Sequence, residues 1–298
     1  MRISHFEYHA ATSLKDALDK LRQFGPDARV IAGGTDLVIR MKLKIDRPKH
    51  VIGITNIKEL DYVRKEGSTI RIGALSKFSD LASESILREN IPILCEAASK
   101  IGSWQIRNMA TIGGNLCSAS PSADSAPALL VLNARLVIAG PEGEEEILCG
   151  SFFTGPRKNV LQQNQILKEI LVDQPIGSSA GTYLKLMRKK AADLAVVGVA
   201  VQCELDQDGE RLANLAIGLC GVASTPIRTP RAEAILKGLN YDQTLEKVSE
   251  AARTAAMETQ PFCDRASADY RKAVVEVYVR RAVVKILDTL FSKEGGQQ

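Results

Sequence analysis

Two short glycine-pair loops are the parts of the sequence best suited to chemistry, 32-AGGTD-36 and 111-TIGGN-115. Glycines leave backbone amides unobstructed, and consecutive amides of this kind bind phosphate oxygens. One loop could hold one phosphate and two could hold a pyrophosphate, with side-chain donors from Thr35, Thr111 and Asn115. Either pair alone is more typical of a tight turn. The two together favour a phosphate site.

Each motif is accompanied by a carboxylate: Asp36 ends the first loop, and Asp124 follows the second. A carboxylate repels phosphate, so we expect them to accept hydrogen bonds from ribose or ribityl hydroxyls, or to order the loops. The chain lacks G-x-G-x-x-G after a strand and G-x-x-x-x-G-K-[ST], which argues against a Rossmann dinucleotide site and a P-loop.

Histidines and cysteines offer little further chemistry. The three histidines precede residue 51, so later chemistry must come from a cofactor or from carboxylates, lysines and cysteines. His5 and His9 are four residues apart, but we expect a strand or surface position and predict no metal site. The cysteines form no C-x-x-C pair, which favours reduced thiols in a cytoplasmic protein over disulfides, zinc or iron–sulfur sites. They are Cys95, Cys117, Cys149, Cys203, Cys220 and Cys263.

The bulk composition indicates a globular protein. The chain has 298 residues, of which 45% are hydrophobic and 25% charged, with a net charge of +4. That length allows two or three domains. The charge forms no basic stripe, so nucleic acid and membrane partners are not expected. We find no signal-peptide core at the N-terminus and no apolar run long enough to span a bilayer.

The elements that must position the loops divide the chain into three parts. Residues 1–57 are predicted to form a small α/β unit, with a helix that Ser13 caps and Gly25-Pro26 ends. Strands are predicted at 29–32 and 51–54.

Residues 58–176 are predicted to form a second α/β unit. The acidic run Glu144 to Glu146 is expected to be a solvated strand edge, and residues 110–127 are expected to form a loop. The predicted strands are 69–75, 135–140, 144–149 and 166–173, and the helices are 77–85 and 91–101.

Residues 177–298 are predicted to form a sheet backed by helices. The predicted strands are 182–189, 194–205 and 213–223, and the helices are 230–238, 243–259 and 267–291.

The segments 32-AGGTDL-37 and 105-QIRNMATIGGNLCSASPSAD-124 resemble the flavoprotein subunit of the molybdenum hydroxylases, the xanthine dehydrogenase and aerobic carbon monoxide dehydrogenase group. The resemblance covers nearly the whole chain. Its other segments are 6-FEYHAATSLKDAL-18, 151-SFFTGPRK-158, 183-YLKLMRKKAADLAVVG-198 and 218-GLCGVASTPIR-228.

The resemblance implies an α+β chain: an FAD-binding domain of two α/β subdomains of the PCMH/VAO type (1–57 and 58–176), then a C-terminal sheet-plus-helices domain of the CO dehydrogenase flavoprotein type (177–298). FAD would lie between these parts, its pyrophosphate held by residues 30–37 and by the second glycine loop. The implied cofactor-binding residues are Val30, Ile31, Ala32, Gly33, Gly34, Thr35, Asp36, Leu37, Ile101, Ala110, Thr111, Gly114, Asn115, Cys117, Ser118, Asp124, Leu167 and Lys185.

The resemblance also implies an oxidoreductase subunit without catalytic side chains, in which FAD carries electrons from [2Fe-2S] clusters to NAD, quinone or another acceptor. Lys185 could favour reduced flavin through its charge, or it could be an ordinary surface lysine. Cys117 is interpreted as a packing residue. No cysteine-rich insertion is present, so no iron–sulfur cluster is expected in this chain.

The implied partners are a small [2Fe-2S] subunit and a large molybdopterin subunit, assembled as a dimer of heterotrimers. Arg107 and the basic segment from Lys42 to Lys49 are candidate partner contacts, although a solvated charged face also explains that segment. Two alternatives stay open: a standalone FAD-dependent oxidoreductase, and a non-enzymatic module that binds another phosphate ligand.

Overall fold

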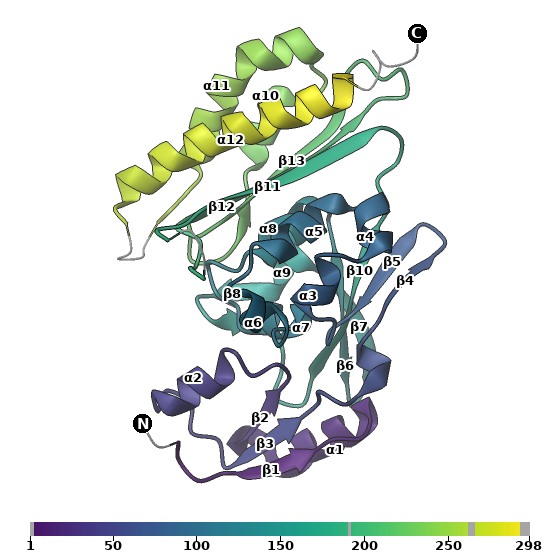
Figure 1. Cartoon of the computed structure of the whole chain (residues 1–298), viewed down its shortest axis with the longest axis vertical. Helices are drawn as coiled ribbons and strands as arrows, with labels where there is room; N and C mark the ends of the chain where they lie inside the picture. The colour runs from purple at the N-terminus through teal and green to yellow at the C-terminus, as the bar shows by residue number, and fades with distance from the viewer. Residues whose placement is uncertain (1–2, 190–191, 262–265, 293–298) are drawn as a thin grey trace.

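Three sheets of three to five strands follow one another along the chain (Figure 1), and a two-stranded hairpin accompanies the second. The computed structural model describes residues 3–189, 192–261 and 266–292. No helix within these ranges is long and apolar enough to cross a membrane.

The first sheet is parallel, with strand order β1-β3-β2. Helix α1 packs on it and buries Ala17 and Leu21. The helix begins after Ser13, whose hydroxyl accepts a 3.1 Å hydrogen bond from the Asp16 amide, and it ends at Gly25, as the sequence predicted. The elements are β1 (Glu7–Ala10), α1 (Leu14–Phe24), η1 (Gly25–Asp27), β2 (Ala28–Ile31), α2 (Leu37–Lys42), β3 (His50–Gly53) and η2 (Lys58–Leu60).

The second sheet is antiparallel, with order β4-β5-β10-β6-β7. Its strands are β4 (Val63–Glu66), β5 (Thr69–Gly73), β6 (Arg135–Gly140), β7 (Gly143–Leu148) and β10 (Ile166–Asp173). A core of aliphatic side chains joins the sheet to its helices. The helices are α3 (Phe78–Leu81), α4 (Ser85–Asn90), α5 (Pro92–Ser99), α6 (Trp104–Arg107), α7 (Ile112–Cys117), α8 (Ser125–Val131) and α9 (Cys149–Phe152), and a small hairpin pairs β8 (Phe153–Gly155) with β9 (Lys158–Asn159).

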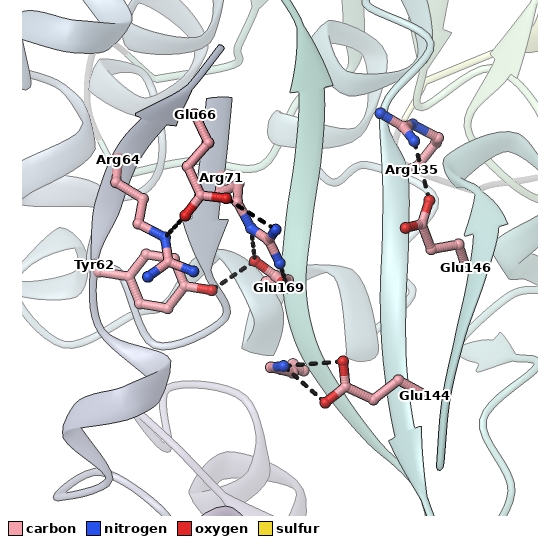
Figure 2. Close-up of polar contacts among 9 residues, drawn as sticks. Tyr62, Arg64, Glu66, Arg71, Arg135, Glu144, Glu146 and Glu169 are labelled. Atoms are coloured by element: carbon pink, nitrogen blue, oxygen red, sulfur yellow. Dashed lines mark hydrogen bonds and ion pairs between the residues drawn. The ribbon is translucent and has the colours of Figure 1, made fainter. Parts of the chain in front are cut away.

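Charged side chains cross-link strands of this second sheet (Figure 2). The Glu169 side chain is fully buried, and it accepts hydrogen bonds from the Arg71 guanidinium and the Tyr62 hydroxyl. The predicted hairpin of 135–140 and 144–149 is confirmed, and the acidic run is its exposed edge strand. Glu144 pairs with Lys168, and Glu146 pairs with Arg135.

The third sheet has the order β11-β12-β13-β14, with antiparallel pairing throughout. Helices α10 to α12 pack on it through one core. The other face of this third sheet packs against the helices of the second unit. Its side chains Tyr183, Ala200 and Ala216 belong to the core of that unit. The elements are β11 (Ser179–Leu186), β12 (Val197–Leu205), β13 (Leu212–Cys220), β14 (Ile227–Arg228), α10 (Pro230–Leu236), α11 (Tyr241–Met257) and α12 (Ala268–Phe291).

The expected loop at 110–127 is wrong, because it contains α7 and the start of α8. The hydroxyl of Thr111 accepts a 3.1 Å hydrogen bond from the Gly114 amide and caps α7. Gly113 lies against Ala74, the residue after β5, where a Cβ on Gly113 would be 2.6 Å from the Cβ of Ala74. The close approach to Ala74 and the cap explain why this glycine-rich segment forms a helix.

Candidate cofactor-binding site

A cavity of about 490 Å³ lies where the first two units meet. Its walls include the first glycine loop, which leaves β2, and helix α7, which contains the second glycine pair. Leu167 from the central strand β10 also lines it. The two glycine motifs therefore face one space, as a two-sided phosphate site requires.

The two motifs contact each other directly. A Cβ on Gly33 would lie 1.8 Å from the carbonyl oxygen of Met109, so only glycine allows this approach. The Ser118 hydroxyl donates a 3.0 Å hydrogen bond to the Asp36 carboxylate. Asp36 therefore orders the loops, which was one of its two expected roles.

Only the first motif leaves its amides available for a ligand. Within the described parts of the chain, the backbone amides of Gly33, Gly34 and Thr35 donate no hydrogen bond to a protein acceptor. In the second motif Ile112 donates to the Ser76 carbonyl at 3.0 Å and Gly113 to the Ala74 carbonyl at 2.9 Å. The expectation that both motifs present free amides is therefore wrong for the second motif. Its amides donate hydrogen bonds to the Thr111 cap and to carbonyls of the segment after β5.

Most of the predicted cofactor residues lie on the cavity wall. The lining includes Val30, Ile31, Ala32, Gly33, Gly34, Thr35, Asp36, Leu37, Ala110, Thr111, Gly114, Asn115, Cys117, Ser118 and Leu167. Ile101, Asp124 and Lys185 do not belong to this lining.

Asp124 and Lys185 form a buried ion pair instead. The Lys185 ammonium lies 2.8 Å from the Asp124 carboxylate, and the two side chains are 1% and 6% exposed respectively. The Tyr183 hydroxyl donates to the same carboxylate at 2.7 Å. Burial raises the pKa of the Asp124 carboxyl, and Lys185 opposes that rise. The carboxylate offsets the lysine charge, so this geometry does not support Lys185 as a free positive charge at the flavin.

Asn115 and Cys117 contribute differently to the wall. The Asn115 side-chain oxygen accepts a 2.6 Å hydrogen bond from the Ser125 hydroxyl, so its amide nitrogen is the group left to donate. Burial raises the pKa of the Cys117 thiol to about 12, so the thiol stays protonated and packs. Five of the cysteines form no disulfide within the described residues, and Cys263 lies outside those residues; the five are Cys95, Cys117, Cys149, Cys203 and Cys220.

The structure adds charged residues that the sequence analysis missed. Arg29, Arg40, Asp46 and Arg157 line the cavity. Arg40 forms an ion pair with Asp46, and its hydrogen bond holds the pKa of that carboxyl below its usual range. Arg157 forms no ion pair with a carboxylate of the described residues, although its charge contributes to the lowered pKa of Asp46. The signal for Arg157 was the segment 151-SFFTGPRK-158, which the resemblance included without giving it a role.

Arg107 is not available to a partner, contrary to the expectation. It is buried, it donates a 2.7 Å hydrogen bond to the Ile101 carbonyl, and its guanidinium lies 4.9 Å from the centre of the Trp104 ring. The guanidinium therefore holds the segment between α5 and α7 together. Lys42, Lys44 and Arg47 of the basic segment are exposed.

Comparisons with known proteins identify both parts of the chain. Residues 4–175 match the FAD binding domain in molybdopterin dehydrogenase, and residues 182–286 match the CO dehydrogenase flavoprotein C-terminal domain. The carbon monoxide dehydrogenase medium chain of Hydrogenophaga pseudoflava is 36% identical, over 93% of this chain and 96% of the relative. The nicotinate dehydrogenase FAD-subunit of Eubacterium barkeri is 35% identical over 98% of both chains.

A solved structure of the Hydrogenophaga pseudoflava carbon monoxide dehydrogenase matches with a TM-score of 0.91 and 37% identity. The match covers 95% of this chain and 97% of that one. The fold class, the FAD cofactor and the oxidoreductase assignment are thereby confirmed. This chain belongs to the family of FAD-binding subunits of molybdenum hydroxylases, together with the carbon monoxide dehydrogenase and xanthine dehydrogenase flavoproteins.

Proposed function

We propose that this chain receives electrons from the [2Fe-2S] clusters of a partner subunit and passes them through FAD to NAD, quinone or another acceptor. FAD, when bound, exchanges electrons singly or in pairs. The observation that carries the proposal is the cavity that two glycine motifs enclose, with the unpartnered amides of residues 33–35 on its wall. No side chain of this chain needs to act as a nucleophile or base.

The residues around the cavity suggest how the cofactor is held. The amides of Gly33, Gly34 and Thr35 would donate to pyrophosphate oxygens, because they have no protein acceptor in the described chain. Arg157, which also lines the cavity, would offset part of the phosphate charge. The Asn115 side-chain amide would add an uncharged hydrogen-bond donor. The Asp124–Lys185 pair would support this wall from behind without contacting the phosphates.

Exposed apolar side chains next to the cavity support a partner contact there. Ile39 on α2 and Leu43 directly after it are exposed, as are Trp104 on α6 and Met109 in the segment after that helix. Met109 also contacts the first glycine loop through its carbonyl. Exposed apolar groups of this kind are typical of protein interfaces. We therefore place the [2Fe-2S] subunit over α2 and α6, with the molybdopterin subunit completing the heterotrimer.

Two further parts of the proposal concern organisation. We propose a division into residues 1–57, 58–176 and 177–298, which the succession of three sheets supports. We also propose a cytoplasmic location, since the thiols that the structure describes are unpaired.

The test has two steps. The first is an absorption spectrum of the purified chain, with identification of the compound that heat denaturation releases. A two-banded flavin spectrum and released FAD would support the site, whereas a colourless chain that FAD cannot reconstitute would overturn it. The second is anaerobic reduction of the loaded chain, followed by addition of NAD⁺ or a quinone. Reoxidation identifies the acceptor, and a chain that neither compound reoxidises would contradict both named acceptors.

A further inference from the structure

Three metal-ligating side chains converge on the first sheet, on the strands β1 and β3. Glu7 and His50 are register partners in the parallel pairing, and His9 lies two residues beyond Glu7 on β1. Residues two apart on a strand point to the same face, which brings the three side chains together. One ligand atom from each lies within 4.8 Å of the others.

The separations match a tetrahedral metal site. The His9 Nε2 and His50 Nδ1 atoms are 3.1 Å apart, and the Glu7 carboxylate oxygen lies 3.8 Å and 3.5 Å from them respectively. Zinc binds nitrogen and oxygen at about 2.0–2.1 Å, so two ligand atoms on a tetrahedron are about 3.3–3.4 Å apart. The three atoms therefore need to move by only a few tenths of an ångström to share one ion.

Phe24, the last residue of α1, holds both imidazoles in place. Its ring stacks on His9 with 4.5 Å between centroids and on His50 with 4.0 Å. Both histidine side chains are about one-fifth exposed, so an ion in solution can reach them. Stacking on Phe24 restricts the orientations of both imidazole rings before any ion binds. The loss of side-chain entropy on metal binding is therefore smaller.

We propose that Glu7, His9 and His50 bind a divalent transition metal of the zinc class, with the fourth position open to water. Two imidazole nitrogens and one carboxylate oxygen suit such ions better than Mg²⁺ or Ca²⁺, which prefer oxygen ligands. In the metal-free chain one imidazole donates a hydrogen bond to the other, and that proton moves to the far nitrogen on binding.

The metal would join the first strand of the chain to the middle strand of its sheet. The order β1-β3-β2 places β3 beside β2, and β2 leads into the first glycine loop. The core of this unit contains few buried residues, so a cross-link between strands has a large relative effect on its stability.

The test uses the untagged, FAD-loaded chain after dialysis against a chelator. Zinc is added at low micromolar concentration, and calorimetry and elemental analysis give the bound amount. We expect one zinc ion per chain and a higher midpoint of thermal unfolding. His9→Gln and His50→Gln should each abolish the bound zinc. The chain has only three histidines, and His5→Gln, at an exposed position outside the cluster, is the matched control that should retain it.

Glu7→Gln keeps the test decisive if a histidine variant misfolds, because the Glu7 side chain is 64% exposed and its substitution leaves the core intact. It should weaken zinc binding about tenfold or more. Wild-type chain that binds no zinc, or His5→Gln losing as much zinc as His9→Gln, would overturn the site.

Discussion

The hydroxyl of Ser118 donates a 3.0 Å hydrogen bond to the carboxylate of Asp36, 82 residues earlier in the chain. Ser118 follows α7 and Asp36 precedes α2, so the bond joins the ends of the two glycine motifs. Together with the contact of Gly33 on the Met109 carbonyl, it joins the first glycine loop and helix α7, which belong to different units, into one wall. A substitution in either motif therefore acts on both.

Gly33→Ala should separate the two motifs, because the added Cβ would lie 1.8 Å from the Met109 carbonyl oxygen. We expect FAD affinity to fall by at least about tenfold, which corresponds to roughly 1.4 kcal/mol. Flavin absorbance per chain measures the effect. Gly150→Ala is the control, since its nearest neighbour would be 3.6 Å away. Full FAD content in Gly33→Ala would contradict the wall described here.

Gly113 and Gly114 should respond differently despite being adjacent. A Cβ on Gly113 would meet Ala74 at 2.6 Å, so Gly113→Ala should lower the thermal stability of the FAD-free chain. A Cβ on Gly114 meets only the Thr111 hydroxyl, at 2.9 Å, and this residue lines the cavity. Gly114→Val should therefore reduce FAD binding more than stability. Equal losses of stability in both variants would argue against the assignment.

Arg157→Gln should weaken FAD binding about ten- to hundredfold, because a charge-assisted contact to phosphate contributes about 1.5–3 kcal/mol. The remaining affinity should depend less on salt than in the wild-type chain. Titrations of FAD at two salt concentrations give both values. Arg64→Gln, on the exposed strand β4, is the control that should bind like the wild-type chain. Unchanged affinity in Arg157→Gln would remove this arginine from the site.

The Asp124–Lys185 pair should show strong coupling in a double-mutant cycle. Lys185→Met alone leaves a buried carboxylate without its cation, and such losses cost about 3–5 kcal/mol of unfolding free energy. Combining it with Asp124→Asn removes both charges and should restore much of the stability. Denaturant unfolding of the four proteins measures the coupling. Additive effects would show that the two groups do not interact.

Glu169 should make the chain sensitive to acid. Burial alone raises the pKa of its carboxyl, but hydrogen bonds from Arg71 and Tyr62 outweigh burial and hold the pKa below its ordinary value of 4.5. A lowered folded pKa gives stability that is present above the unfolded pKa and is lost as pH falls through the folded value.

Glu169→Gln should therefore cost about 1–3 kcal/mol at pH 7 and less at low pH, where the wild-type carboxyl is also protonated. Unfolding free energies from pH 7 down to pH 3 follow this convergence. A difference between the two proteins that stays constant with pH would contradict the role of the charge.

Local signals in the sequence were enough to predict α1, because Ser13 and Gly25 are a cap and a stop that act within one turn. The hairpin of β6 and β7 was predictable for the same reason. Helix α7 was not, because Thr111 and the contact with Ala74 must overcome the low helix propensity of two glycines.

Residues that depend on distant partners were harder to place. Arg107 was expected to contact a partner subunit, but its partners are the Ile101 carbonyl and the Trp104 ring. In the sequence His9 was considered together with His5, because the two are four residues apart. In the structure the parallel pairing of β1 with β3 brings His9 next to His50 instead. Strand pairing of this kind is set by packing over long sequence separations, which a local pattern does not record.

Strand β10 is the last strand of its sheet in sequence, yet it lies at the centre, between β5 and β6. During synthesis, β4 to β7 therefore emerge from the ribosome before β10, the strand that pairs with both β5 and β6, has been made. Leu167 on β10 is also part of the cavity wall. A nascent chain that ends before residue 166 has both glycine motifs but lacks the strand that joins β5 to β6. We therefore expect cofactor uptake only after β10 has left the exit tunnel.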